Sequence, residues 1–213
     1  MTIRDWVASK LATEDFMSEY TGTNGLLVET EEGKRLVVVA EPGPDAFGLE
    51  ELADFLEVYP DCEAVVMIKR FPDVGVVEAA RSRGVLVDLF GDVAQALRSR
   101  RPLREFQSRD EKYLRSRIET HQKVSGMVRI GLGAWRVERR GLRELLIITH
   151  DRYEFPVDEL LRLLSENPNL EPDAFVVTNP NTTGLSTRVK EAAAHTGTEI
   201  YLLKDFFLRL SRE

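Results

Sequence analysis

Apolar positions in the first half of the chain change their spacing several times, and each spacing predicts an element. From Ile3 to Leu11 they recur at intervals of three and four residues, which predicts an amphipathic helix. Residues 25–29 and 35–39 are short apolar runs on either side of a glycine-containing turn, which predicts a β-hairpin. Residues 64–68 form a continuous apolar run, as expected for a strand that is buried on both faces.

The rest of this half continues with alternating helices and strands. Helices are predicted around residues 49–58, 76–83 and 92–97, with a strand at 85–89. The predicted order is therefore helix, two strands, helix, strand, helix, strand, helix. Antiparallel strands early and strand-helix-strand crossovers late predict an α/β module with a mixed sheet between helices.

The second half repeats the pattern of the first. Residues 33–40 match 141–148 at an offset of 108, residues 61–64 match 171–174 at 110, and residues 78–84 match 191–197 at 113. Loop insertions of two and three residues explain the growing offset. The repeat predicts two tandem copies of a three-layer module, at residues 1–100 and 104–213, with a linker at residues 98–106, which include Pro102. A single doubly wound domain is the competing architecture.

Composition limits the chemistry. The chain has 213 residues, 43% of them hydrophobic, with one cysteine and three histidines in no metal-binding spacing, so a structural zinc site is excluded. The N-terminus shows no signal-peptide pattern, and no apolar run is long enough to span a bilayer. We therefore expect a cytoplasmic protein without a membrane partner or an organic cofactor.

Charge is unevenly distributed. The net charge is −7, yet residues 98–143 hold fourteen basic and five acidic residues, which leaves −16 for the rest. This segment either forms a phosphate-binding face or packs against the acidic first copy, whose residues 1–97 hold eight basic and nineteen acidic residues. The candidate nucleic-acid-binding residues are arginines of the segment: Arg101, Arg115, Arg117, Arg136, Arg139 and Arg140.

Element order in both halves resembles the restriction-endonuclease-like superfamily, PD-(D/E)xK, especially its Mrr-type restriction enzymes and archaeal Holliday-junction resolvases. The best local match begins with the apolar strand and Thr/Asn-rich turn of residues 176–184. It continues through Ala192, Ala193 and Gly197 and ends with residues 200–210. These motifs are the structural half of the family pattern, and the resemblance implies two tandem nuclease-like modules.

The catalytic half of the family pattern is where this sequence departs. In that family, an acidic residue on the strand entering the hairpin and a Glu/Gln-x-Lys on the partner strand hold a divalent metal. The partner strands here end in residues 39–43 and 149–152, and neither contains the x-Lys. The acids that would serve in a nuclease are Glu29 with Glu41, and Glu138 with Asp151. The resemblance thus implies a decayed catalytic centre, with magnesium needed only if the protein is active.

His150 and the turn at residues 178–183 offer further chemistry. His150 has no accompanying Ser or Cys nucleophile, so we expect a hydrogen-bonded structural histidine. The turn either binds an anion through its backbone amides, or its Asn and Thr side chains cap the helix that follows and satisfy the turn, which is the favoured interpretation.

Three functions fit these observations. The leading one is a non-catalytic module of nuclease-like fold that associates with nucleic acid or binds a protein. The first alternative is an active metal-dependent DNA endonuclease. The second is a protein-protein adaptor that acts on a DNA-binding or transcription factor, in which the acidic first copy mimics or masks a basic partner.

Overall fold

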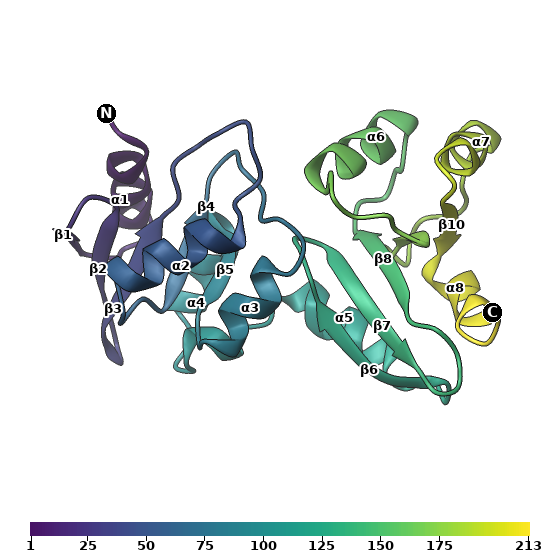
Figure 1. The fold of residues 1–213 in the computed structure, drawn as a ribbon, viewed down its shortest axis with the longest axis horizontal. Coiled ribbons are helices and arrows are strands. Elements are labelled where there is room, and N and C mark those ends of the chain that lie inside the picture. The colour runs from purple at the N-terminus through teal and green to yellow at the C-terminus, as the bar shows by residue number, and fades with distance from the viewer. The chain divides into compact units, whose positions relative to one another are not determined.

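The structure, a computed structural model, describes all 213 residues and divides into two compact units. Unit 1 is Met1–Ser108 and unit 2 is Arg109–Glu213 (Figure 1). The division therefore falls a few residues beyond the predicted linker. Leu103 explains the difference, because its side chain is 2% exposed and packs in the core of unit 1.

Unit 1 is built from four α-helices and a five-stranded sheet. The helices are α1 (Ile3–Thr13), α2 (Leu49–Val58), α3 (Val76–Ser82) and α4 (Phe90–Leu97), followed by a short 3-10 helix at Leu103–Glu105. The strands are β1 (Ser18–Thr21), β2 (Gly25–Thr30), β3 (Gly33–Val39), β4 (Ala64–Met67) and β5 (Leu86–Leu89). They lie in the order β1-β2-β3-β4-β5, antiparallel from β1 to β3 and parallel from β3 to β5.

Unit 2 has the same series of elements. Its helices are α5 (Arg109–Ile118), α6 (Val157–Glu166), α7 (Thr187–His195) and α8 (Leu203–Arg209). Its strands are β6 (Val124–Arg129), β7 (Ala134–Arg139), β8 (Leu145–His150), β9 (Ala174–Val177) and β10 (Glu199–Leu202). Their order and directions repeat those of unit 1. The same strand order in both halves agrees with the predicted internal duplication.

Each unit has one strand more than the sequence pattern predicts. The additional strands, β1 and β6, lie at the edge of each sheet beside β2 and β7. All four side chains of β1 are at least partly exposed, and the register of β6 shifts between Val124 and Gly126. Neither strand therefore shows the regular apolar alternation from which strands are identified.

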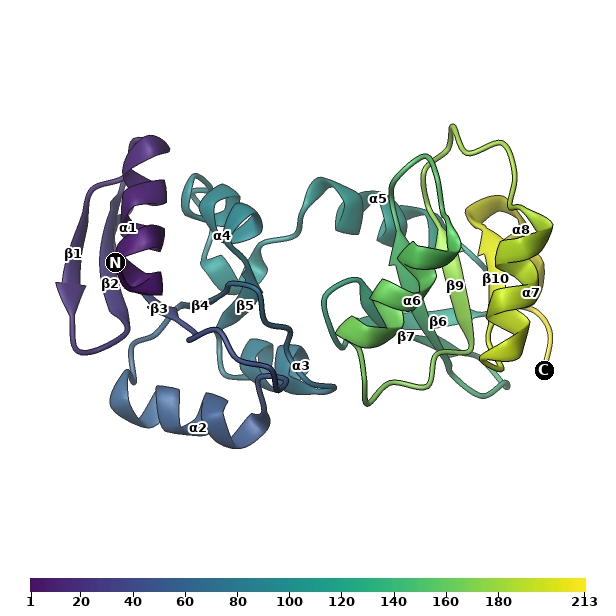
Figure 2. The ribbon, with the colours of Figure 1, turned by 90° about the horizontal axis from the view of Figure 1, so that it is seen from above.

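Helices cover both faces of each sheet. In β3, Val37 and Val39 pack in the core that contains α1 and α4, whereas Val38 packs in the core that contains α2 and α3. Figure 2 shows these helix pairs on opposite sides of the strands. In unit 2, Ile147 packs with α5 and α8, and Ile148 packs with α6 and α7. Alternation along the central strands thus produces three layers in each unit. None of the helices has the length and apolar composition needed to cross a membrane.

The strand registers refine the alignment of the two halves. Val37 pairs with Ala64 in unit 1, and Ile147 pairs with Ala174 in unit 2, so β3 and β8 correspond at an offset of 110 residues. The sequence match of residues 33–40 gave 108. A shift of two residues keeps every side chain on the same face of a strand, which is why the pattern match still identified the equivalent strand.

Candidate functional site

The four acidic residues identified from the family resemblance lie at opposite ends of their hairpins. Glu29 pairs in register with Lys34 beside the β2–β3 turn, whereas Glu41 follows the far end of β3. Glu138 lies near the β7–β8 turn, whereas Asp151 follows the far end of β8. At about 3.3 Å per strand residue, each pair is separated by roughly 20 Å. The fold therefore brings neither pair together.

Asp151 interacts instead with Asp110, from the first turn of α5. The pKa of the Asp110 carboxyl is raised, first by burial and then by the charge of Asp151. No group of three or more His, Cys, Asp or Glu side chains converges anywhere in the chain. With the acids of each hairpin apart and no lysine at the end of β8, the side chains do not fit the catalytic metal centre of the family that the chain resembles.

His150, the last residue of β8, is held at both ring nitrogens. Its Nδ1 lies 3.0 Å from Oε1 of Glu159, and its Nε2 lies 3.0 Å from the backbone oxygen of Glu154. A hydrogen bond from Arg162 lowers the pKa of Glu159, which keeps that carboxylate an acceptor. The buried ring also meets the edge of Phe155, with 4.8 Å between centroids. His150 is thus the structural histidine that the sequence predicts, with no nitrogen left for a ligand.

Two of the basic candidates in unit 2 are paired with acidic side chains of that unit. Arg115 contacts Glu111 at 3.1 Å and Glu119 at 2.8 Å. Arg136 lies 3.6 Å from Glu144. Acidic side chains of the same unit already neutralise these two charges. Their presence therefore requires neither a phosphate ligand nor packing against the acidic first copy.

Arg139 is buried and caps the end of α8. Its Nη1 donates to the backbone oxygen of Arg212 at 2.6 Å and makes longer contacts with those of Arg209 and Leu210, while Nε donates to the Arg143 oxygen at 2.7 Å. Carbonyls at the end of a helix have no partner within the helix, so a cation there is favourable. Burial lowers the pKa of Arg139. The buried side chain is engaged with backbone oxygens inside unit 2.

Arg101, Arg117 and Arg140 remain exposed. Arg101 belongs to unit 1, shortly before the 3-10 helix, and the Arg140 side chain contacts the Gln122 backbone oxygen at 3.4 Å. Arg117 lies on α5 with its guanidinium carbon 5.9 Å from the centre of the Phe207 ring. Arg117 lines a cavity of unit 2.

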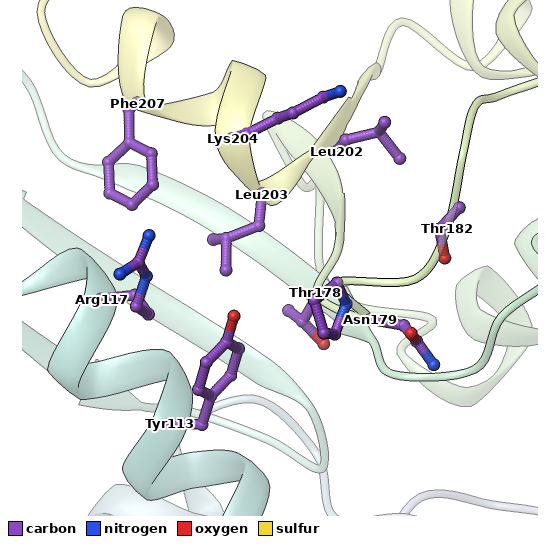
Figure 3. Close-up of a pocket in the computed structure, with 10 residues that line it drawn as sticks. Tyr113, Arg117, Thr178, Asn179, Thr182, Leu202, Leu203, Lys204 and Phe207 are labelled. Atoms are coloured by element: carbon purple, nitrogen blue, oxygen red, sulfur yellow. The ribbon is translucent and has the colours of Figure 1, made fainter.

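This cavity has a volume of about 190 Å³ and lies within unit 2. Its walls come from α5, from the loop at residues 178–182, and from residues 202–207 where β10 meets α8. The last two segments follow the carboxyl ends of the parallel strands β9 and β10, the usual position of ligands in α/β sheets. Figure 3 shows Arg117 between the rings of Phe207 and Tyr113, with Lys204 on the far side of Leu203.

The loop at residues 178–182 is a fixed wall. Thr178, Asn179 and Thr182 each donate a side-chain hydrogen bond to a backbone oxygen of residues 150–153, at 3.1, 2.9 and 2.9 Å. The prediction that these side chains cap α7 is wrong, because α7 is capped by Ser186. The accompanying prediction that they satisfy the turn is confirmed, since Oδ1 of Asn179 accepts a 2.9 Å hydrogen bond from the Asn181 N–H. The polar side chains of the loop are used to hold it in place.

Three donors in the cavity wall make no hydrogen bond or ion pair within the protein. They are the guanidinium of Arg117, the ammonium of Lys204 and the hydroxyl of Tyr113. The contact of Arg117 with the face of Phe207 positions the guanidinium without using its N–H groups. The cavity thus offers hydrogen-bond donors and positive charge, which suits an anion.

The corresponding place in unit 1 is filled by aromatic packing. The buried positions of the helices align the two units. In this alignment α1 matches α5, so that Trp6 corresponds to Tyr113 and Lys10 to Arg117. Likewise α4 matches α8, so that Phe90 corresponds to Leu203 and Gly91 to Lys204. Trp6 meets Phe90 edge to face at 5.7 Å, and Lys10 lies 5.8 Å from the Trp6 ring. Unit 1 has a glycine in place of Lys204, so the two cations are a property of unit 2.

Sequence reasoning identified Arg117 but not the residues that surround it. Tyr113 and Arg117 lie four residues apart and therefore on one face of α5, a spacing that the sequence shows. Phe207 is half-buried, and it packs against the core of unit 2 while it also lines the cavity. No local pattern reveals that Lys204 lines the same cavity, because only the fold brings α8 beside α5.

Comparison of the chain with models of known protein families, with curated proteins and with solved structures finds no match.

Proposed function

We propose that the chain is a non-catalytic, nuclease-like protein whose unit 2 binds nucleic acid. The observation that carries this proposal is the pair of unpartnered cations, Arg117 and Lys204, in the cavity wall beyond β9 and β10. Phosphates bind where Arg and Lys are free to donate, and such contacts dominate the affinity of nucleic-acid-binding proteins.

The distribution of charge between the units supports unit 2 as the binding unit. Unit 1 has twelve basic and twenty acidic residues, whereas unit 2 has seventeen basic and sixteen acidic residues. The excess negative charge of the chain thus belongs to unit 1. A phosphate backbone is repelled less by unit 2, and its free cations are not outweighed by a net negative charge.

Sheet architecture supports the nuclease-like relationship, and side-chain placement supports the loss of catalysis. Both units have antiparallel strands first and parallel strands later, between layers of helices, as the resemblance implies. The acids expected to act together lie at opposite hairpin ends, and β8 is followed by Asp151 and Arg152 instead of a lysine-bearing motif.

Fluorescence anisotropy with phosphorylated single-stranded and duplex DNA and RNA tests the proposal. We expect binding at low salt that weakens when Arg117 and Lys204 are both replaced by alanine. Replacement of Lys10, the equivalent of Arg117 in unit 1, is the matched control and should leave binding unchanged. Absence of binding to every oligonucleotide, or equal binding by the double variant, would overturn the proposal.

The acidity of unit 1 supports a second candidate, an adaptor that binds a basic protein. Such a chain would bind a lysine-rich polypeptide in a salt-dependent manner and would not bind the oligonucleotides. The same anisotropy measurement, with a labelled basic peptide added as a second probe, separates the two functions.

A further inference from the structure

We infer that the cavity of unit 2 receives the phosphorylated end of a nucleic-acid strand, with the terminal phosphate held by Arg117 and Tyr113. This inference rests on the proposed binding of nucleic acid and specifies which part of the ligand enters the protein. It is carried by three observations: the number of free donors on the α5 wall, the size of the cavity, and the place of Lys204.

The free donors on α5 match a terminal phosphate better than an internal one. Arg117 presents a planar fork that bonds two phosphate oxygens at once, and the hydroxyl of Tyr113 supplies a third donor on the same helix face. A terminal phosphate has three free oxygens, whereas a phosphodiester within a strand has two. The guanidinium of Arg117 lies over the face of the Phe207 ring, so its N–H groups remain free to bond the phosphate.

The size of the cavity also favours a chain end. Its volume of about 190 Å³ is below the range of about 300–1,000 Å³ that is common for pockets enclosing whole small molecules. A space of this size accepts a phosphate with part of its sugar, and the rest of the strand must lie outside. The loop at residues 178–182 closes one side and is tied by its side chains to residues 150–153, so this wall is preformed.

Lys204 lies where the strand would leave the cavity. It is in the first turn of α8, on the other side of Leu203 from Arg117, and its side chain is exposed. The lysine ammonium is a point charge on a flexible stem. It therefore suits an internucleotide phosphate, which needs a nearby positive charge but no fixed arrangement of donors. We therefore place the second phosphate of the strand at Lys204.

Four ligands of one base sequence test this inference: a single strand with a 5′-phosphate, one with a 3′-phosphate, one with hydroxyls at both ends, and a circular strand. One of the phosphorylated strands should bind about tenfold or more tightly than the hydroxyl-ended and circular strands, which is the effect of one hydrogen bond to a charged group. Arg117→Ala should remove this preference, Tyr113→Phe should reduce it, and Lys10→Ala should retain it. Circular dichroism confirms that each variant is folded.

The other outcomes are distinct. Equal binding of all four strands would overturn the inference and leave the proposed function standing, whereas absence of binding to all four would overturn the proposed function itself. A free nucleoside monophosphate is the remaining probe. If it binds as tightly as the phosphorylated strand, the cavity is a mononucleotide site and the assignment to a strand end is overturned.

Discussion

The guanidinium of Arg139 donates a 2.6 Å hydrogen bond to the backbone oxygen of Arg212, a residue 73 positions later in the chain. This contact joins β7 to the end of α8, the helix that supplies Lys204 and Phe207 to the cavity. A residue that the charge pattern suggested for nucleic-acid binding therefore stabilises the wall of the site. The distinction between structural and free arginines in unit 2 leads to the following predictions.

Replacing Arg139 with alanine should destabilise the protein. The variant loses hydrogen bonds from a buried cation to helix-terminal carbonyls, and we expect a loss of about 2 kcal/mol in the free energy of unfolding. Urea unfolding measures it. The neighbouring Arg140 is exposed, so Arg140→Ala is the control and should change stability by less than about 0.5 kcal/mol. Equal effects of the two substitutions would show that Arg139 is not a cap.

Replacing Asp110 with asparagine should stabilise the protein at neutral pH. The raised pKa of Asp110 means that its ionised form is disfavoured in the folded state, by burial first and by Asp151 second. The stability associated with its protonated form is complete below the ordinary pKa of 3.8 and is lost as the pH rises through the folded-state pKa. The melting temperature of the variant should exceed that of the wild type at pH 7, and the gap should narrow as the pH falls. A gap that is constant with pH, or a less stable variant, would contradict this prediction.

Gly84 and Gly197 should not tolerate a side chain. They occupy equivalent positions after α3 and α7, with φ of 84° and 74°, a region that alanine adopts at a cost of about 1–2 kcal/mol. A Cβ at Gly197 would meet nothing within 4 Å, so Gly197→Ala measures backbone strain alone. Gly91, within α4 and also open, is the control, and its replacement with alanine should be neutral or stabilising. Unchanged stability of Gly197→Ala would refute the assigned turn.

No cleavage of single-stranded, duplex or branched DNA is expected with magnesium or manganese. The acids of each hairpin are about 20 Å apart, and neither strand end supplies the expected lysine. A gel assay with end-labelled substrates provides the measurement. Cleavage that disappears on Glu41→Ala or Asp151→Ala would restore these residues as metal ligands and identify the protein as a nuclease.

The order of the helices and of the central strands could be predicted from the sequence, because buried apolar positions recur with the period of the element that they belong to. Continuous apolar runs marked β4 and β9, and paired small residues marked α3 and α7, whose Ala80 and Ala193 are buried against the sheet. Comparing the two halves supplied a check on each assignment. The edge strands β1 and β6 could not be recognised, because an edge strand with exposed or irregular side chains leaves no alternating pattern.

The candidate site was less predictable, because charge along a chain does not reveal which charges meet. Arg115 and Arg139 both lie in the basic segment, yet one pairs with Glu111 and the other with carbonyls at the end of α8. Arg117 differs from them only in what the fold places nearby. Its neighbour Lys204 comes from 87 residues later in the chain, and no spacing rule joins two such residues.

The salt dependence of binding tests the central claim, that free cations of unit 2 contact phosphates. The logarithm of affinity for a phosphorylated single strand should fall linearly with the logarithm of salt concentration. In the Arg117→Ala, Lys204→Ala double variant, the magnitude of that slope should be smaller by about 1.4, since each lost phosphate contact on a single strand contributes about 0.7. Lys10→Ala should leave the slope as it is. A double variant that is folded and retains the wild-type slope would contradict the account.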